Sequence, residues 1–205
     1  TADNDIKVMV QYLTTAAGNA AILPQGGIDN GKMDTSYTAS APEIPGYTIR
    51  TKTSEGFDVI NVGGTYQTTI TLKANNSDGS AGNTITFLYE PATDLSYTIN
   101  RTFIGQDGNE VEGAGSTEVI PQRQMDESYQ ITPLQVEELE RKDENDNVVY
   151  DDYILDKATL QDKDHATPTA VDNPLDFMIK IGYPSANNVI NLTYRYMTAE
   201  DYRGL

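Results

Sequence analysis

The 205-residue sequence has no cysteine, no tryptophan and a single histidine. Without cysteine there can be no disulfide bonds, thiolate metal sites or cysteine nucleophiles. Basic residues are also scarce, since 14 Lys and Arg stand against 31 Asp and Glu, for a formal net charge of −17. Such a surface repels phosphate backbones, so nucleic acid is not an expected partner. No apolar run approaches the roughly 18 residues of a membrane-spanning helix, so membrane insertion is not expected either.

Signatures of catalysis are missing as well. The one histidine, His165, lies in an acidic segment. The sequence has no Gly-x-Ser-x-Gly elbow, no histidine-rich metal motif and no glycine-rich phosphate loop. We therefore predict that the chain is not an enzyme and carries no organic cofactor. It also shows no signal peptide or wall-sorting tail, so we expect an internal fragment of a longer protein.

What the sequence does contain is a pattern that occurs twice. An alternating run at residues 6–12 has a counterpart at residues 97–103. A closing run that is rich in threonine, isoleucine and tyrosine lies at residues 84–89 and again at residues 189–196. Duplications of this length are typical of modular arrays, which bind or extend more often than they catalyse. The repeat predicts two domains, residues 1–92 and 93–205.

The two halves differ in charge and length. Residues 1–92 carry 9 acids and 5 bases, a net charge of −4, whereas residues 93–205 carry 22 acids and 9 bases, a net charge of −13. The second half is longer because an acidic insertion follows Tyr129. Insertions of this kind usually lie in surface loops.

Alternation of apolar and polar residues predicts a mainly β chain. Residues 65–73 and 84–89 are expected to pair as a hairpin with a long loop. A helix is expected over residues 133–142, where the composition favours one, and a short helical turn within residues 33–40, capped by Asp34. Most of the 13 tyrosines are expected in the core or half-buried in a sheet, although a stacking surface for sugars is an alternative.

Two groups of residues could form special sites. Oxygen ligands with the spacing of a calcium loop are offered by Asp143, Asn145, Asn147 and Asp151, although the glycine and glutamate of an EF-hand loop are absent and a solvated turn is the alternative. A covalent crosslink is the second possibility, because Lys7 in the first strand and Asn83 before a later strand could form a Lys–Asn isopeptide bond. Chance placement of this pair is the other interpretation.

These motifs resemble the mucin-binding (MucBP/Mub-type) repeats of Gram-positive, lactobacillus-like surface adhesins. The resemblance rests on the opening strands, the Asp107-Gly-Asn109 turn, the Pro45-Gly-Tyr47 element and final strands that end in tyrosine. The second half departs from this pattern, since no Pro-Gly-Tyr follows Tyr129. The resemblance implies a mainly β (α+β) fold of two tandem, elongated modules of the ubiquitin-like β-grasp type, the second longer by its acidic insertion.

The resemblance also implies a function. It points to a non-catalytic unit of an adhesin anchored in the cell wall of a Gram-positive bacterium, monomeric within a tandem array. Mucin glycans or host glycoproteins would be its partners, with immunoglobulins as a further candidate. The alternative is a structural spacer that projects another binding domain from the cell wall. The sequence identifies neither the ligand nor the contact face.

Overall fold

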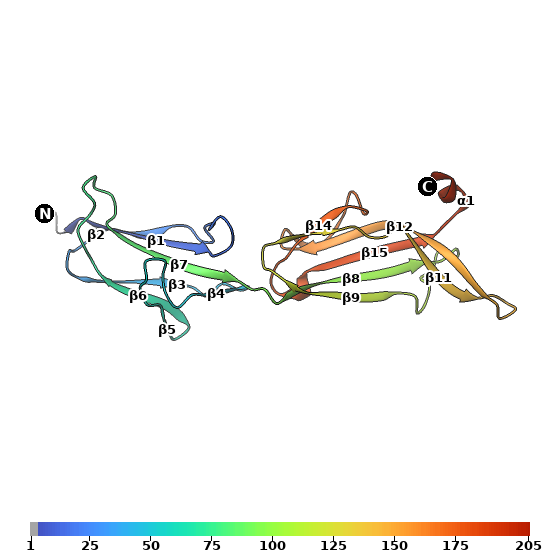
Figure 1. Ribbon diagram of the computed structural model, residues 1–205, viewed down its shortest axis with the longest axis horizontal. Coiled ribbons are helices and arrows are strands. Elements are labelled where there is room, and N and C mark those ends of the chain that lie inside the picture. Colours follow the sequence, from blue (N-terminus) through green and yellow to red (C-terminus); the bar gives the residue numbers. More distant parts are fainter. Residues whose placement is uncertain (1–3) are drawn as a thin grey trace. The chain divides into compact units, whose positions relative to one another are not determined.

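The computed structural model describes residues 4–205, which divide into two compact units: unit 1 ends at Ala92, and unit 2 comprises residues 93–205. Both units are built mainly from strands, which confirms the mainly β prediction (Figure 1). Two short helical elements lie in the second unit: the 3-10 turn η2 (Ser185–Asn187) and the helix α1 (Ala199–Gly204).

Unit 1 consists of two sheets that lie one above the other (Figure 1). The first has the order β2-β1-β7-β4, and the second has the order β3-β6-β5. In the first sheet the opening and closing strands of the unit, β1 and β7, are parallel neighbours at the centre. The strand bounds are β1 (Ile6–Thr14), β2 (Gly26–Gly31), β3 (Ser36–Ala41), β4 (Tyr47–Ile49), β5 (Ile60–Val62), β6 (Thr65–Thr71) and β7 (Asn83–Pro91).

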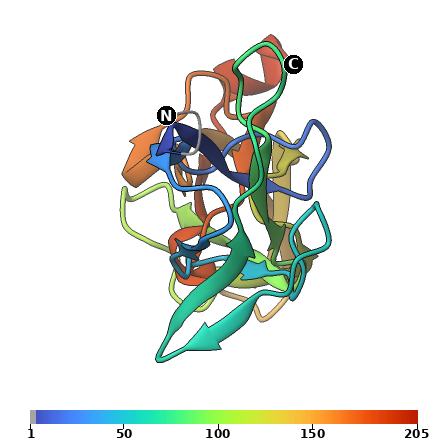
Figure 2. The same ribbon diagram turned by 90° about the vertical axis from the view of Figure 1, so that its left-hand side faces the viewer.

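The core of unit 1 lies between these two sheets. The inward-facing residues Ile6, Val8 and Val10 of β1 and Ile85, Phe87 and Tyr89 of β7 are buried at every second position, because successive side chains of a strand point to opposite faces. Buried side chains from both layers include Ile6, Val8, Ile85, Phe87, Ile70 and Leu72. Removing this apolar surface from water is the main force that holds the layers together. The β5–β6 hairpin extends away from the rest of the unit (Figure 2), and its apolar residues Ile60 and Val62 are exposed.

Unit 2 is organised around a larger sheet of the order β11-β12-β15-β8-β9, with β13 also paired to β12. A small second sheet, β10-β14, covers one end of its buried face through Ile131 and Ile179. The strand bounds are β8 (Leu95–Ile104), β9 (Ser116–Arg123), β10 (Ser128–Ile131), β11 (Val136–Lys142), β12 (Val148–Asp162), β13 (His165–Ala170), β14 (Phe177–Lys180) and β15 (Val189–Tyr196).

The repeat found in the sequence is a repeat of topology. In unit 2 the opening and closing strands, β8 and β15, are again parallel neighbours. Equivalent aromatic pairs face each other in the two registers: Tyr12 lies opposite Phe87, and Phe103 lies opposite Tyr194. The rings stack at centroid distances of 5.7 Å and 5.2 Å, respectively. The tandem repeat is therefore confirmed.

Each unit also contains a buried asparagine that ties the closing strand to the segment before it. Asn83 in unit 1 accepts a hydrogen bond from the Lys73 amide (2.9 Å) and donates one to the Lys73 carbonyl (2.8 Å). Asn188 in unit 2 binds the amide (2.9 Å) and the carbonyl (2.8 Å) of Gly182 in the same way. We call each arrangement an asparagine clamp. The asparagine side chain thus provides hydrogen-bond partners for a backbone amide and a backbone carbonyl that no neighbouring strand pairs with.

Three local predictions were wrong. The expected helix over residues 133–142 is the strand β11, which pairs with β12 along its whole length. The expected helical turn within residues 33–40 is a turn with Asp34 in the left-handed region (φ 61°), followed by β3. The segments at 65–73 and 84–89 do not pair with each other, because β6 and β7 belong to different sheets.

Candidate functional site

The structure separates the residues of the expected calcium loop into two groups. Asp143, Asn145 and Asn147 lie in the turn of the β11–β12 hairpin, where Oδ1 of Asp143 accepts the amides of Asn145 and Asn147 at 2.9 Å each. Asp151 lies farther along the ladder, opposite Leu139, and forms an ion pair with Arg141.

These positions fit calcium poorly, because calcium takes six to eight oxygen ligands and one carboxylate of the four residues already pairs with a guanidinium. Within residues 4–205 no group of three or more His, Cys, Asp and Glu is placed to hold a metal ion. Calcium binding at this turn stays a prediction.

The Lys7 and Asn83 side chains do not meet. The Lys7 ammonium group donates to the carbonyl of Gly79 at 2.8 Å. The Asn83 amide is engaged by the backbone of Lys73, with a longer contact of 3.4 Å to the Lys7 carbonyl. The suggested crosslink between these side chains is therefore wrong, because each has found a backbone partner.

Most of the tyrosines are buried or half-buried, as expected. Tyr89 and Tyr194 are buried, and their hydroxyl groups donate to the carbonyls of Pro42 (2.7 Å) and Leu134 (2.8 Å). Burial raises the pKa of Tyr194 to about 12. Three tyrosines are well exposed, all in unit 2: Tyr150, Tyr183 and Tyr202.

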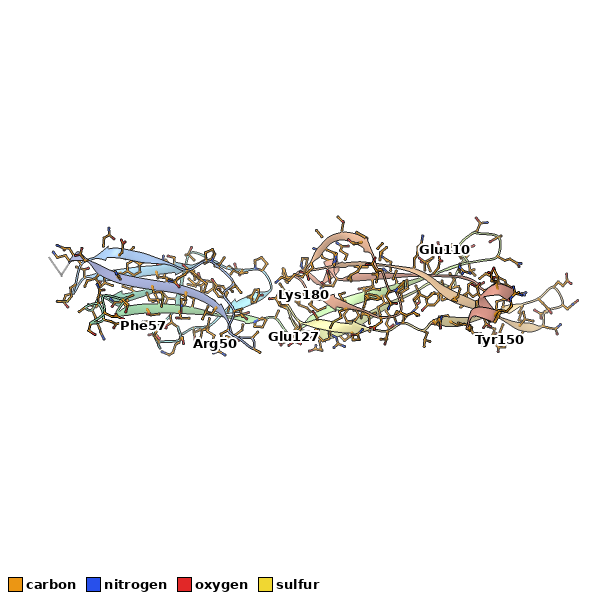
Figure 3. All side chains as sticks on the ribbon, turned by 90° about the horizontal axis from the view of Figure 1, so that it is seen from above. Arg50, Phe57, Glu110, Glu127, Tyr150 and Lys180 are labelled. Carbon is orange, nitrogen blue, oxygen red and sulfur yellow. The ribbon has the colours of Figure 1, made fainter. Side chains whose placement is uncertain are left out.

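A hollow of about 550 Å³ lies in unit 2, where the loop after β8 meets the β11–β12 hairpin. Its lining combines aromatic, amide and charged groups: Gln106, Asp107, Val111, Arg141, Asp151, Tyr153 and Tyr196. We call it the Tyr196 hollow. Figure 3 labels Glu110, next to this lining, and Tyr150, which lies on the hairpin outside it.

The lining of the Tyr196 hollow is fixed by packing and by hydrogen bonds. The rings of Tyr153 and Tyr196 pack edge to face at 5.8 Å, and Tyr153 packs in the same way on Phe103 at 5.5 Å. Asp107 accepts the backbone amide of Asn109 at 3.0 Å, and this bond lowers the pKa of Asp107. The hollow thus presents a tyrosine surface beside two carboxylates and one guanidinium.

Two hollows of unit 1 have a different lining. One, of about 460 Å³, lies between Phe57, β6 and the start of β7. The other, of about 470 Å³, is lined by residues 50–54, Leu88 and Glu90, none of which is aromatic. The first hollow of unit 1 also has one aromatic ring, Phe57, among polar side chains, whereas the Tyr196 hollow combines two tyrosine rings with amide and charged groups, an arrangement that suits a sugar.

The sequence motif Pro45-Gly46-Tyr47 has a clear structural role. Gly46 takes a positive φ of 87°, which glycine tolerates, and turns the chain into β4. The Tyr47 ring then packs edge to face on Tyr89 at 6.5 Å. The sequence pattern of the MucBP domain family matches residues 7–102. This segment is a MucBP domain. The match includes nearly all of unit 1 and continues into β8 of unit 2.

Other comparisons add little to this MucBP assignment. The chain is similar to the tandem domains 3–4 of SHIRT type ("Streptococcal High Identity Repeats in Tandem") from a cell surface protein. The identity is 12%, the TM-score is 0.26, and the match covers 95% of this chain and 99% of that one. No curated protein sequence matches the chain. Among the described residues, no helix is long and apolar enough to cross a membrane.

Proposed function

We propose that the chain is a non-catalytic repeat of a bacterial cell-surface adhesin that binds glycans of mucin-type glycoproteins. Both units would be mucin-binding-type modules, displayed on the wall of a Gram-positive cell as part of a larger protein. The MucBP domain at residues 7–102 supports the class. The Tyr196 hollow supports a glycan contact, because tyrosine edges with neighbouring amide and carboxylate groups can pack on a sugar ring and bind its hydroxyl groups.

Charge limits which glycans fit this site. The hollow holds two carboxylates, Asp107 and Asp151, against the single guanidinium of Arg141, which is already paired with Asp151. Residues 93–205 as a whole carry a net charge of −13. The negative potential of these carboxylates would repel an anionic sugar. We therefore propose that the site takes neutral sugars, and that several weak contacts along an array give high avidity.

The test is binding of the full chain to purified mucin and to a panel of neutral and sialylated glycans. Tyr196→Ala should weaken binding about tenfold, equivalent to about 1.4 kcal/mol. Tyr150→Ala is the matched control, because Tyr150 is an exposed tyrosine of the same unit, on the β11–β12 hairpin outside the hollow, and its loss should not change binding. Circular dichroism would check that both variants are folded.

The same panel separates this function from the alternatives. Binding to immunoglobulin but not to mucin would replace the glycan partner with a protein one. Absence of binding to any glycan, mucin or immunoglobulin would favour the spacer, in which the units only extend another domain. Binding that disappears with a calcium chelator would assign the contact to a bridging ion.

A further inference from the structure

Two oppositely charged side chains meet at the other end of unit 2, away from the Tyr196 hollow. Lys163 lies in the turn between β12 and β13, and its Nζ donates to Oδ1 of Asp126 in the turn before β10. Only 35% of the Lys163 side chain and 31% of the Asp126 side chain are exposed. Figure 3 labels Glu127 and Lys180, which lie at this end of the unit.

The backbone holds the two turns side by side. The Asp126 amide donates to the carbonyl of Ile181 at 2.9 Å, and the Lys163 amide donates to the carbonyl of Lys180 at 3.0 Å. Because Lys180 and Ile181 are consecutive, one short segment positions both turns. Gly182 follows, and a side chain there would come within 3.3 Å of both Cα and Cβ of Lys163. The glycine thus allows the lysine turn to approach closely.

The surroundings favour the uncharged forms of both groups. Burial raises the pKa of Asp126, and Asp164 raises it too, whereas Lys180 lowers it. Burial lowers the pKa of Lys163, as does Lys180, whereas Asp164 raises it. An exposed ion pair would shift both pKa values in the opposite directions. Both shifts bring the contacting amine and carboxyl group closer to the neutral pair that amide formation requires.

We propose that Lys163 and Asp126 form an intramolecular isopeptide bond. The neutral Nζ of Lys163 attacks Cγ of the protonated Asp126 carboxyl group. The C–N bond forms, the C–OH bond breaks, and the hydroxyl leaves with a proton from the amine as water. The nearby charge of Asp164 acts on both groups. No oxidant, metal or cofactor enters this balance.

The bond would tie the turn before β10 to the β12–β13 turn across a separation of 37 residues. Crosslinks of this kind stabilise chiefly by restricting the unfolded chain. The pair differs from Lys7 and Asn83, whose side chains the fold keeps apart. A chain without cysteine would thereby gain a covalent link that reducing conditions cannot break.

Intact mass spectrometry of the folded full chain tests the proposal directly. We expect a mass lower than the sequence mass by one water molecule. Trypsin should then leave residues 124–141 joined to residues 158–180, because a modified Lys163 is not cleaved. Lys163→Ala and Asp126→Ala should each restore the sequence mass and lower the melting temperature by roughly 10 °C or more.

Lys142→Ala is the matched control, because it breaks an exposed ion pair with Asp146 on the same unit and should keep the mass deficit. The proposal fails if the folded wild-type chain keeps its full sequence mass after prolonged incubation. It also fails if the lost water maps to a single peptide containing Asp78-Gly79 or Asp107-Gly108, where a succinimide could form instead. Both of these outcomes are measured on the wild-type chain, so they test the proposal even if a variant does not fold.

Discussion

Replacing Asn188 with alanine should destabilise unit 2 strongly. The Asn188 side chain is fully buried and makes three hydrogen bonds, two to Gly182 and one of 3.1 Å to the carbonyl of Ser96. These bonds connect the start of the closing strand to the segment after β14 and to the opening strand β8. Alanine would leave one amide and two carbonyl groups without their partner.

The size of the effect follows from the number of unsatisfied groups. A buried polar group without a partner costs about 1–3 kcal/mol. A water molecule that enters the vacated space can recover part of this, because the site is polar. We expect a loss of about 3 kcal/mol, against a total of about 5–15 kcal/mol for a typical domain. The melting temperature of unit 2 should fall by roughly 10 °C or more.

Thermal and urea unfolding of the full chain, followed by circular dichroism and tyrosine fluorescence, would measure the loss. Asn187→Ala is the control, since Asn187 is exposed beside the clamp and its change should stay within about 0.5 kcal/mol. Asn83→Ala should act on unit 1 instead, and somewhat less, because its third contact is 3.4 Å long. If Asn188→Ala changes stability no more than Asn187→Ala does, the hydrogen bonds of the Asn188 clamp do not stabilise unit 2.

Three further predictions concern other parts of the chain. Tyr194, whose pKa is raised to about 12, contributes stability that is complete below pH 10 and is lost between about pH 10 and 12, by about 2–3 kcal/mol; Tyr194→Phe should flatten this slope in pH-dependent unfolding. Gly27→Ala should destabilise unit 1 by more than about 3 kcal/mol, because φ is 128° and the new Cβ would lie 1.9 Å from the backbone oxygen of Val8. Gly26→Ala is the control: a Cβ there lies in open space, so thermal unfolding should show almost no change. Asp143→Ala should lower the melting temperature of unit 2 modestly, because two turn amides lose their acceptor; any rise in melting temperature that calcium causes must also disappear in this variant if the ion binds there.

The central strands could be predicted from the sequence because their signals are local. Residues 6–12 and 97–103 alternate regularly, and the structure places them in β1 and β8. Which strands are neighbours was harder to predict. The hairpin expected between residues 65–73 and 84–89 assumed that consecutive strands pair. In the fold the closing strand instead crosses over to lie parallel to the opening one, and this contact between distant residues has no local signal.

The error at residues 133–142 has a different cause. Glutamate, leucine and arginine favour a helix in isolation, but pairing decides the outcome here. Glu137 lies opposite Tyr153, and Arg141 lies opposite Val149, on a strand rich in β-branched and aromatic residues. A usable signal was present, because the acidic run that follows forms the hairpin turn, with Asp146 at a positive φ of 63°. The sequence also did not predict the Tyr196 hollow, because Arg141 contributes to its lining only when residues 136–142 form a strand and not a helix.

The two units separate what maintains the fold from what could bind a ligand. The features common to both, namely the parallel central pair, the stacked rings and the asparagine clamp, are formed mostly by buried side chains. The Tyr196 hollow depends instead on the β11–β12 hairpin, which supplies Arg141, Asp151 and Tyr153 and has no long counterpart in unit 1, where β4 covers only three residues. An insertion at a sheet edge can add such a surface without disturbing the core. Tyr196→Ala, in the lining of the hollow, should therefore weaken binding with little change in melting, and variants of the clamps should do the opposite.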